Sequence, residues 1–188
     1  LLENGKYRIC ANDSVFNTKA VNINNIISLD EKGIAFCTNK GLFIKNGNKQ
    51  TVLLTNKNVQ FAVFKKNKTL MAVVEGQLYQ SDESFVFKQL PVTFPPGFTV
   101  LHAAEEKNED IWFRGLDKGI YRLSQNRMQE MSDRMGMENK AINEFFPDAD
   151  GNFWFCTSGA GILLKKNSAF YNYETSDGLV NNKVLRLL

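Results

Sequence analysis

The stretch that decides the fold reads DADGNFWFCTS at residues 148–158, followed after two residues by GIL at 161–163. It consists of a polar turn, an apolar run, a short polar loop, and a glycine that opens a second apolar run. Aromatic and β-branched residues bounded by Gly, Asn and Asp are typical of β strands joined by tight turns. The stretch therefore predicts two consecutive strands of a sheet.

The same phrase occurs four times along the chain, with landmark glycines at positions 41, 76, 119 and 161, which are 35, 43 and 42 residues apart. Periods of roughly 40–45 residues are typical of β-propeller blades of four strands each. Helical repeats of similar period exist, but no ten-residue window shows helical spacing of apolar residues. The sequence predicts an all-β fold, a β-propeller of four-stranded antiparallel blades, with about four blades present.

We expect residues 1–188 to form a single propeller segment, in which residues 1–25 are an irregular partial blade. The second strand of each blade is apolar on successive residues, which indicates burial on both faces. Residues 184–188 predict the first strand of a further blade, so we expect a larger ring and a longer parent protein. The four predicted blades cover residues 26–55, 59–90, 98–132 and 141–174.

The net charge, the apolar runs and the cysteines argue against a nucleic-acid partner, a membrane span and disulfide bonds in this stretch. The net charge is +3, from 23 basic and 20 acidic residues without a basic stripe, so we expect no nucleic-acid partner. No apolar run reaches the roughly 18 residues needed to cross a membrane. Cys10, Cys37 and Cys156 fall at the same place in different blades, which is beyond the reach of a disulfide, about 4.4–6.8 Å between Cα atoms. We interpret them as small buried apolar residues.

Residues 148–158 with Gly161 resemble the two-component-regulator propeller repeat, whose usual form is Asp-x-Asp-Gly-Asn-apolar-Trp-apolar-Gly-Thr, then Gly and an apolar residue. Residues 177–184 are similar to the linker that follows such repeats, and residues 110–115 are a weaker match. Cys37 and Cys156 stand where the repeat usually has Gly, and the blade at 59–90 keeps only the strand pattern.

Repeats of this family typically build the periplasmic sensor of hybrid two-component systems, especially in Bacteroides-type gut bacteria. There, two seven-bladed propellers and an immunoglobulin-like domain precede a membrane helix and a histidine kinase. The resemblance implies a ligand-sensing module at the periplasmic face of the inner membrane, within a seven-bladed ring and a homodimeric receptor. It implies an oligosaccharide ligand, no catalysis in this segment, and membrane attachment only through segments absent here.

The sequence gives no support for a catalytic or metal site. His102 is the one histidine, and no Gly-x-Ser-x-Gly elbow accompanies it, so we interpret it as structural or channel-lining. Asp148 and Asp150 alternate as in a calcium loop, but the ligand set is incomplete and a β-turn with positive φ at Gly151 is favoured. We predict no catalytic residue, no metal and no cofactor.

Two further features are interpreted as structural rather than functional. Trp112 and Trp154 occupy the same place in two repeats, which predicts packing between blades rather than stacking on a sugar. The acidic residues at 105–110 are expected to lie in a solvated turn.

A ligand is expected on the face formed by the loops between second and third strands and by the linkers between blades. Polar groups with an arginine suit a hydroxylated or anionic sugar, although solvent alone also demands polar loops. The candidate ligand-binding residues are Asn39, Lys40, Arg114, Asp117, Lys118, Ser158, Asn181 and Asn182.

Two alternatives stay open. One is a propeller lyase or glycosidase whose catalytic groups lie outside this stretch. The other is a scaffold that binds protein partners, which would expose a large apolar patch. A fold by itself does not choose between them.

Overall fold

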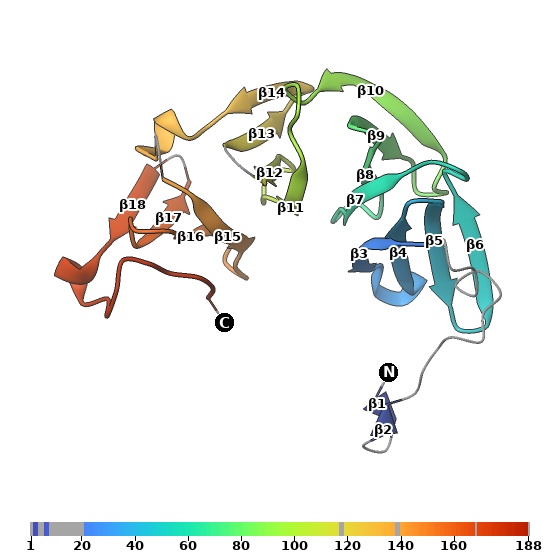
Figure 1. The fold of residues 1–188 in the computed structure, drawn as a ribbon, viewed down its shortest axis with the longest axis horizontal. Coiled ribbons are helices and arrows are strands. Elements are labelled where there is room, and N and C mark those ends of the chain that lie inside the picture. Colours follow the sequence, from blue (N-terminus) through green and yellow to red (C-terminus); the bar gives the residue numbers. More distant parts are fainter. Residues whose placement is uncertain are drawn as a thin grey trace.

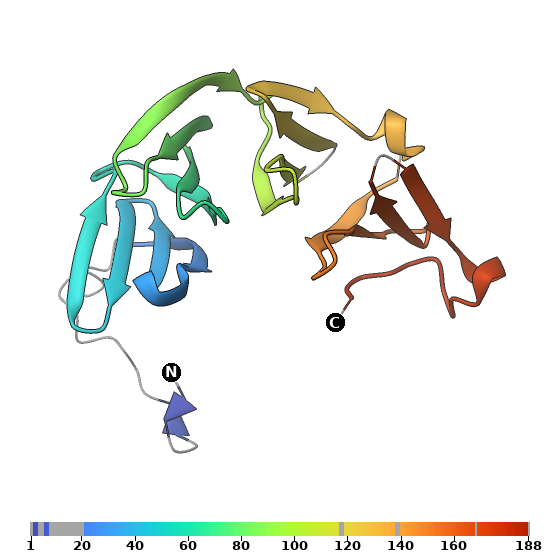
Figure 2. The same cartoon turned by 180° about the vertical axis from the view of Figure 1, so that it is seen from behind.

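The computed structural model describes residues 2–3, 6–7, 21–116, 119–137, 140–167 and 169–187. Four four-stranded antiparallel sheets lie side by side along an arc, with the first strand of each on the concave side and the fourth on the convex side (Figures 1 and 2). This confirms the predicted all-β propeller with about four blades.

Each blade is a meander, in which strands that are consecutive in sequence pair with each other. Blade 1 contains β3 (Ile23–Ser28), β4 (Ile34–Thr38), β5 (Gly41–Asn46) and β6 (Lys49–Leu53). Blade 2 contains β7 (Val59–Phe64), β8 (Leu70–Val74), β9 (Gln77–Ser81) and β10 (Phe87–Thr93). Blade 3 contains β11 (Val100–Glu105), β12 (Ile111–Gly115), β13 (Ile120–Ser124) and β14 (Arg127–Glu130). Blade 4 contains β15 (Ile142–Pro147), β16 (Phe153–Thr157), β17 (Ile162–Lys166) and β18 (Ala169–Tyr173).

The segment before blade 1 differs from the prediction at its boundary. β1 (Leu2–Glu3) and β2 (Lys6–Tyr7) pair as a short hairpin, while Cys10 and most of the predicted partial blade lie outside the described residues. β3 begins at Ile23, inside the range assigned to that partial blade. The reason is Asn24, whose side-chain amide donates to the Val59 carbonyl of blade 2 at 2.8 Å, so a polar residue is satisfied inside a strand.

Residues 184–187, where a further strand was predicted, have no strand pairing within the described chain. Nearby, an isolated bridge joins Ser158 to Lys183, and the Val184 amide donates to the Thr157 carbonyl at 2.9 Å. A β strand takes its hydrogen-bond ladder from a neighbouring strand. The further blade therefore stays a prediction.

The hydrophobic core is divided among the three seams, that is, the interfaces between successive blades. β8 is buried at all five residues. Because successive side chains point to opposite faces of a strand, Leu70, Ala72 and Val74 join the cluster shared with blade 1, whereas Met71 and Val73 join the cluster shared with blade 3. Burial on both faces explains the unbroken apolar runs of the second strands.

Trp112 packs between blades, as predicted. Its side chain is fully buried, with ring centroids 5.6 Å from Phe153 and 5.3 Å from Phe155 of blade 4. Trp154, at the same place in blade 4, is half-buried and stacks 6.5 Å from Tyr173 of its own blade. The prediction of packing between blades is therefore confirmed for Trp112 alone.

Asp148 forms the predicted turn. Its carboxylate accepts hydrogen bonds at 2.8 Å from the Asn152 backbone N–H, the Asn152 amide and the Trp154 indole N–H. These bonds, the one from Trp154 first, lower the pKa of Asp148 below its ordinary value. Gly151 has a φ of 84°, as the turn requires. Among the described residues, no group of three or more His, Cys, Asp and Glu is placed to hold a metal ion.

Of the acidic residues at 105–110, which the sequence placed in a solvated turn, Glu109 is exposed as predicted and the other three are not. Glu105, Glu106 and Asp110 are buried, because each finds a partner near a seam. Glu106 pairs with Lys165 of blade 4 and accepts the Trp112 indole N–H at 2.8 Å. Asp110 pairs with Arg122, and Glu105 accepts the Lys66 backbone N–H of blade 2 at 2.7 Å. A carboxylate can be buried when it has a partner. The sequence alone does not reveal which carboxylates have one.

The interpretation of the cysteines is confirmed for the two that the structure describes. Cys37 and Cys156 are free thiols with no exposed surface. Burial disfavours the thiolate and raises the pKa of Cys37 to about 12.

His102 joins blade 3 to blade 4. It is half-buried, and its Nε2 lies 2.9 Å from the Phe145 carbonyl, to which it donates. The ring also meets Phe145 and Phe61 edge-on, at centroid distances of 4.8 and 6.3 Å. Desolvation is the first cause that lowers the pKa of His102, and Arg114 adds to it, while the Phe145 hydrogen bond and Glu144 oppose it. The neutral ring is a structural link, as predicted.

A pair of glycines in one loop gives a matched test of the close approach of β17 and β18 within blade 4. A Cβ at Gly161 would lie 1.9 Å from the Tyr173 carbonyl oxygen, whereas a Cβ at Gly159 meets nothing within 4 Å, and both residues have positive φ. We expect Gly161→Ala to lower the free energy of unfolding by at least about 3 kcal/mol, and Gly159→Ala by about 1–2 kcal/mol. Urea denaturation measures both, and equal losses would contradict the steric account.

The single histidine makes a pH test of the blade 3–blade 4 link possible. Because the folded pKa of His102 is lowered, the unfolded chain takes up the proton first as the pH falls. We expect the free energy of unfolding to fall as the pH drops below about 6.5, by no more than about 1.4 kcal/mol per pH unit. His102→Gln keeps an N–H donor but does not titrate, so this slope should vanish in urea denaturation between pH 7 and 5.5. An unchanged slope would show that His102 is not its source.

Candidate ligand-binding site

The pairing of first and second strands is the same in all four blades, so residues at equivalent positions can be aligned by register. Each first strand carries one extra, bulged residue, and the residue after it faces a fixed position of the second strand. The residues at this fixed position are Cys37, Val73, Arg114 and Cys156. Three are buried and uncharged, and Arg114 of blade 3 is the exception.

Arg114 is a half-buried cation in a position that elsewhere is apolar. Its Nε is shielded from solvent and has no hydrogen-bond partner among the residues that the structure describes. Desolvation lowers the pKa of Arg114, while the nearby carboxylate of Glu144 opposes that shift. Glu144 also pairs with Arg186, with 3.5 Å between Oε2 and Nε. A shielded donor without a partner is unfavourable, so this position is poorly explained by stability.

Blade 3 also departs from its neighbours at the bulge of the first strand. The bulged residues are Asn24, Gln60, Leu101 and Asn143. The amide of Asn143 donates to the Val184 carbonyl at 2.8 Å, as that of Asn24 does to Val59, and Gln60 accepts the Gly76 N–H at 2.7 Å. Leu101 has no polar group to make such a bond and is 39% exposed.

A third departure lies at the end of the second strand. The hydroxyl groups of Thr38 and Thr157 donate to the carbonyls of Gly41 and Gly161, at 2.9 and 2.8 Å, and brace the loop to the third strand. Blade 3 has Gly115 at this position, and blade 2 has Val74. Neither of these can brace the loop with a side-chain hydroxyl. The loop after β12 therefore lacks a restraint that blades 1 and 4 have.

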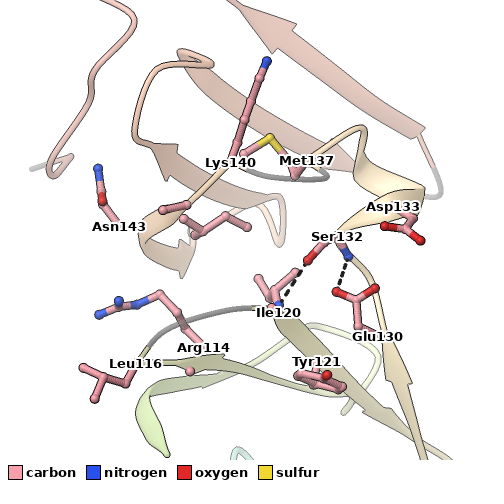
Figure 3. Close-up of a pocket in the computed structure, with 14 residues that line it drawn as sticks. Arg114, Leu116, Ile120, Tyr121, Glu130, Ser132, Asp133, Met137, Lys140 and Asn143 are labelled. Atoms are coloured by element: carbon pink, nitrogen blue, oxygen red, sulfur yellow. Dashed lines mark hydrogen bonds between the residues drawn. The ribbon is translucent and has the colours of Figure 1, made fainter. Parts of the chain in front are cut away.

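A cavity of about 710 Å³ lies beside Arg114 and Gly115, in the seam between blades 3 and 4. Its walls come from β12 and the following loop, β13, the linker after β14 that contains η2 (Asp133–Met135), and the start of β15. Figure 3 shows these walls. The lining residues are Arg114, Gly115, Leu116, Gly119, Ile120, Tyr121, Glu130, Ser132, Asp133, Met137, Lys140, Ala141, Ile142 and Asn143.

Charge is separated across this cavity. In Figure 3, Arg114 lies at one end with Asn143 above it, and Glu130 and Asp133 lie at the other end. One oxygen of Glu130 accepts the Ser132 backbone N–H at 2.9 Å. Desolvation first, and then Glu130, raise the pKa of Tyr121. With apolar side chains between the charged ends, the cavity can hold a ligand that has both hydrogen-bonding and apolar faces.

A second cavity, of about 680 Å³, lies in the same seam and includes Glu106, Arg122 and Lys165 in its walls. Lys165 pairs with Glu106, and Arg122 pairs with Asp110. Arg122 Nε is shielded without a hydrogen bond, as Arg114 Nε is, but the Arg122 guanidinium pairs with Asp110 through Nη2, so these charges form a network that joins the blades. No such ion pair is seen for Arg114 among the described residues, and the first cavity is therefore the candidate site.

Of the predicted ligand-binding residues, Arg114 lines this cavity. Asp117 and Lys118 lie outside the described residues. Asn39 and Ser158 hold equivalent places in blades 1 and 4, since their N–H groups donate to Asn22 and Ala141 before the respective first strands. Neither they nor Lys40, Asn181 and Asn182 line the cavity. The prediction that these residues bind a ligand stays untested, but the structure does not bring them into one cavity with Arg114.

Asn181 and Asn182 have structural roles in the linker after β18. The Asn181 side chain accepts the Lys183 N–H at 2.8 Å, and the Asn182 side chain accepts the Thr175 N–H at 2.7 Å. Sequence reasoning missed several lining residues, among them Tyr121, Glu130, Lys140 and Asn143. One signal was available, namely an arginine in the repeat position held by Cys37 and Cys156.

No helix in the described part of the chain is long and apolar enough to span a membrane. No protein-family model and no curated protein sequence matches this chain.

Solved structures do match. One is the extracellular domain of the hybrid two-component system BT3049 of B. thetaiotaomicron, at 16% identity and a TM-score of 0.59, over 84% of this chain and 24% of that one. Another is the extracellular domain of BT4673 from the same organism, named as a one-component system, at 18% identity and a TM-score of 0.60, over 87% of this chain and 23% of that one.

A third is an inactive H270A variant of virginiamycin B lyase from Staphylococcus aureus with quinupristin, at 16% identity and a TM-score of 0.60, over 86% of this chain and 59% of that one. The chain thus spans about a quarter of the sensor domains and somewhat over half of the lyase. At these identities the likeness shows the fold. The resemblance seen in the repeats is therefore matched by structures of Bacteroides sensor domains, and the chain is a segment of β-propeller.

Proposed function

We propose that this chain is an extracytoplasmic propeller module that binds a carbohydrate in the cavity between blades 3 and 4, as the sensing part of a two-component signalling protein. The observation that carries the proposal is Arg114. The Arg114 side chain is charged and lines the cavity, and its Nε is shielded without a hydrogen bond among the described residues. The other blades have Cys or Val at the same position. Residues that break a repeat without a structural gain are typical of functional sites.

The lining of the cavity supports a carbohydrate as the ligand. Its volume lies within the roughly 300–1,000 Å³ range of small-molecule sites. The carboxylates of Glu130 and Asp133 can accept hydrogen bonds from sugar hydroxyls. Leu116 and Ile142 offer apolar surface to the C–H face of a sugar ring.

The location of the cavity suits a sensor. Its walls belong to two blades and to the linker between them, so a bound ligand would contact both sides of one seam. A ligand shifts a conformational equilibrium only by its difference in affinity for the two states. Signalling through a homodimeric receptor, attachment to the membrane through other segments and a periplasmic location belong to the same proposal. The extracellular domains of similar fold support an extracytoplasmic location.

A lyase is the second candidate, because a lyase shares the fold. The inactive variant of that enzyme lacks a histidine. Here, the single histidine, His102, has its Nε2 bonded to the Phe145 carbonyl and is absent from the cavity lining. We therefore favour binding, and treat catalysis and a protein partner as outcomes of the test.

The test follows the melting temperature of the purified protein against a panel of oligosaccharides. A ligand that binds only the folded state adds about 2.7 kcal/mol of apparent stability at a hundred times its Kd. We expect at least one intact oligosaccharide to raise the melting temperature, and Arg114→Val to abolish that rise. Val is chosen because Val73 fills the same position in blade 2.

Arg127→Val is the matched control, since Arg127 is exposed on β14 and is absent from the cavity lining. It removes the same charge and should leave the shift in place. Cleavage of the oligosaccharide, seen by chromatography of the mixture, would indicate an enzyme. A panel without any shift would contradict a carbohydrate ligand and leave the protein scaffold as the better hypothesis.

A further inference from the structure

We infer that the ligand of this cavity carries an oxyanion, a carboxylate or a sulfate group on a saccharide, and that Arg114 is the residue that binds it. The inference rests on the proposed function, because it concerns the same cavity, and it narrows the ligand from carbohydrates in general to acidic ones.

The first step is the state of the Arg114 side chain. A guanidinium group is always charged and presents five N–H donors in a planar fork. Here it is half-buried, and its Nε is shielded without a partner. A planar fork of this kind matches the two oxygens of a carboxylate, or two oxygens of a sulfate, through parallel hydrogen bonds. An uncharged hydroxyl would offer it one acceptor and no opposite charge.

The second step concerns the carboxylates of the chain itself. Glu144 is near enough to raise the pKa of Arg114, but it also pairs with Arg186, which is mostly exposed. Glu130 and Asp133 lie at the far end of the cavity in Figure 3, where Glu130 accepts the Ser132 N–H. None of these gives the shielded Nε of Arg114 a hydrogen bond.

The third step is the comparison with the other seams. At the position of Arg114, blade 1 has Cys37 and blade 2 has Val73, and both are buried within apolar clusters shared with the next blade. A propeller seam therefore closes without a cation at this point. In the seam between blades 3 and 4, the arginine coincides with the cavity and with the loss of the bracing threonine at Gly115. An arginine at this repeat position therefore favours a role in binding an anion over a role in packing.

The separation of charge sets the expected pose. The acidic group of the ligand would lie against Arg114, while its hydroxyl groups would extend towards the carboxylates of Glu130 and Asp133. Lys140 lies on the wall formed by the linker, with its side chain pointing away from Arg114 in Figure 3. A ligand with an oxyanion at one end and hydroxyls at the other would meet both ends of the cavity.

The experiment compares matched probes at constant ionic strength, by calorimetry and by thermal melting. One pair is oligogalacturonides and their methyl esters, in which a methyl group replaces the negative charge of each carboxylate. A second pair is a sulfated oligosaccharide and its desulfated form. Sodium sulfate alone is the third probe, because it presents the oxyanion without a sugar. The variants are Arg114→Val, Arg114→Lys and the control Arg127→Val.

We expect the acidic member of at least one pair to bind the wild-type protein about tenfold or more tightly than its neutral partner. Arg114→Val should remove that preference, and Arg114→Lys, which keeps the charge but not the fork, should keep only part of it. Arg127→Val should keep all of it. Without ligand, Arg114→Val should melt no lower than the wild type, because it removes a shielded, unpartnered charged group. Should that variant nevertheless fail to fold, Arg114→Lys decides alone.

The outcomes separate this inference from the proposed function. Equal affinity for acidic and neutral partners, unaffected by Arg114→Val, would overturn the oxyanion while a carbohydrate sensor stands. Stabilisation by sodium sulfate that needs Arg114, with no binding of any saccharide, would support the oxyanion site and overturn the carbohydrate. An acidic preference that survives Arg114→Val would overturn the role of Arg114. No response to any probe would overturn both.

Discussion

Burial of each second strand on both faces is the constraint on which this structure depends. A four-stranded meander offers two apolar faces and cannot cover either of them by itself. β8 shows the requirement at its clearest, because its side chains alternate between two clusters that belong to different neighbours. The blades therefore have no cores of their own. The seams are the core, and any group that a seam contains must be apolar, paired or in contact with a ligand.

Most polar groups in the seams obey this rule, although among the described residues a few atoms, Arg114 Nε and Arg122 Nε among them, are shielded without a hydrogen bond. Glu106 is paired with Lys165 and bonded to Trp112, and His102 donates to the Phe145 carbonyl, so blades 3 and 4 are joined by polar links as well as by packing. Arg114 lies in the same seam, with its Nε shielded and without such a partner. Because the two other seams show, at Cys37 and Val73, what a seam requires at this position, the repeat provides an internal control that a non-repetitive fold lacks. That control is the reason for placing function here.

The sequence was informative wherever the signal was local. The turn at Asp148, the four strands of each blade and the burial of Trp112 all follow from residues within one repeat. It was uninformative where partners come from different blades. The start of β3 at Ile23 was not predicted, because the Val59 carbonyl that accepts from Asn24 lies in blade 2. The burial of Glu106 was not predicted, because its partner Lys165 is 59 positions away. The cavity was missed for the same reason, since its walls are contributed by two blades and the linker between them.

The same reasoning explains why equivalent loop residues made a poor set of site candidates. Asn39 and Ser158 have the same backbone role at the same end of their blades, but those blades lie at opposite ends of the arc (Figure 1). Repetition along the chain places such residues around a ring, about one blade apart, whereas a small ligand fits within a single seam. A site in a propeller is therefore made by what one blade has and its neighbours lack. In this chain, that difference is concentrated at Leu101, Arg114 and Gly115, on the side of blade 3 that meets the linker to blade 4.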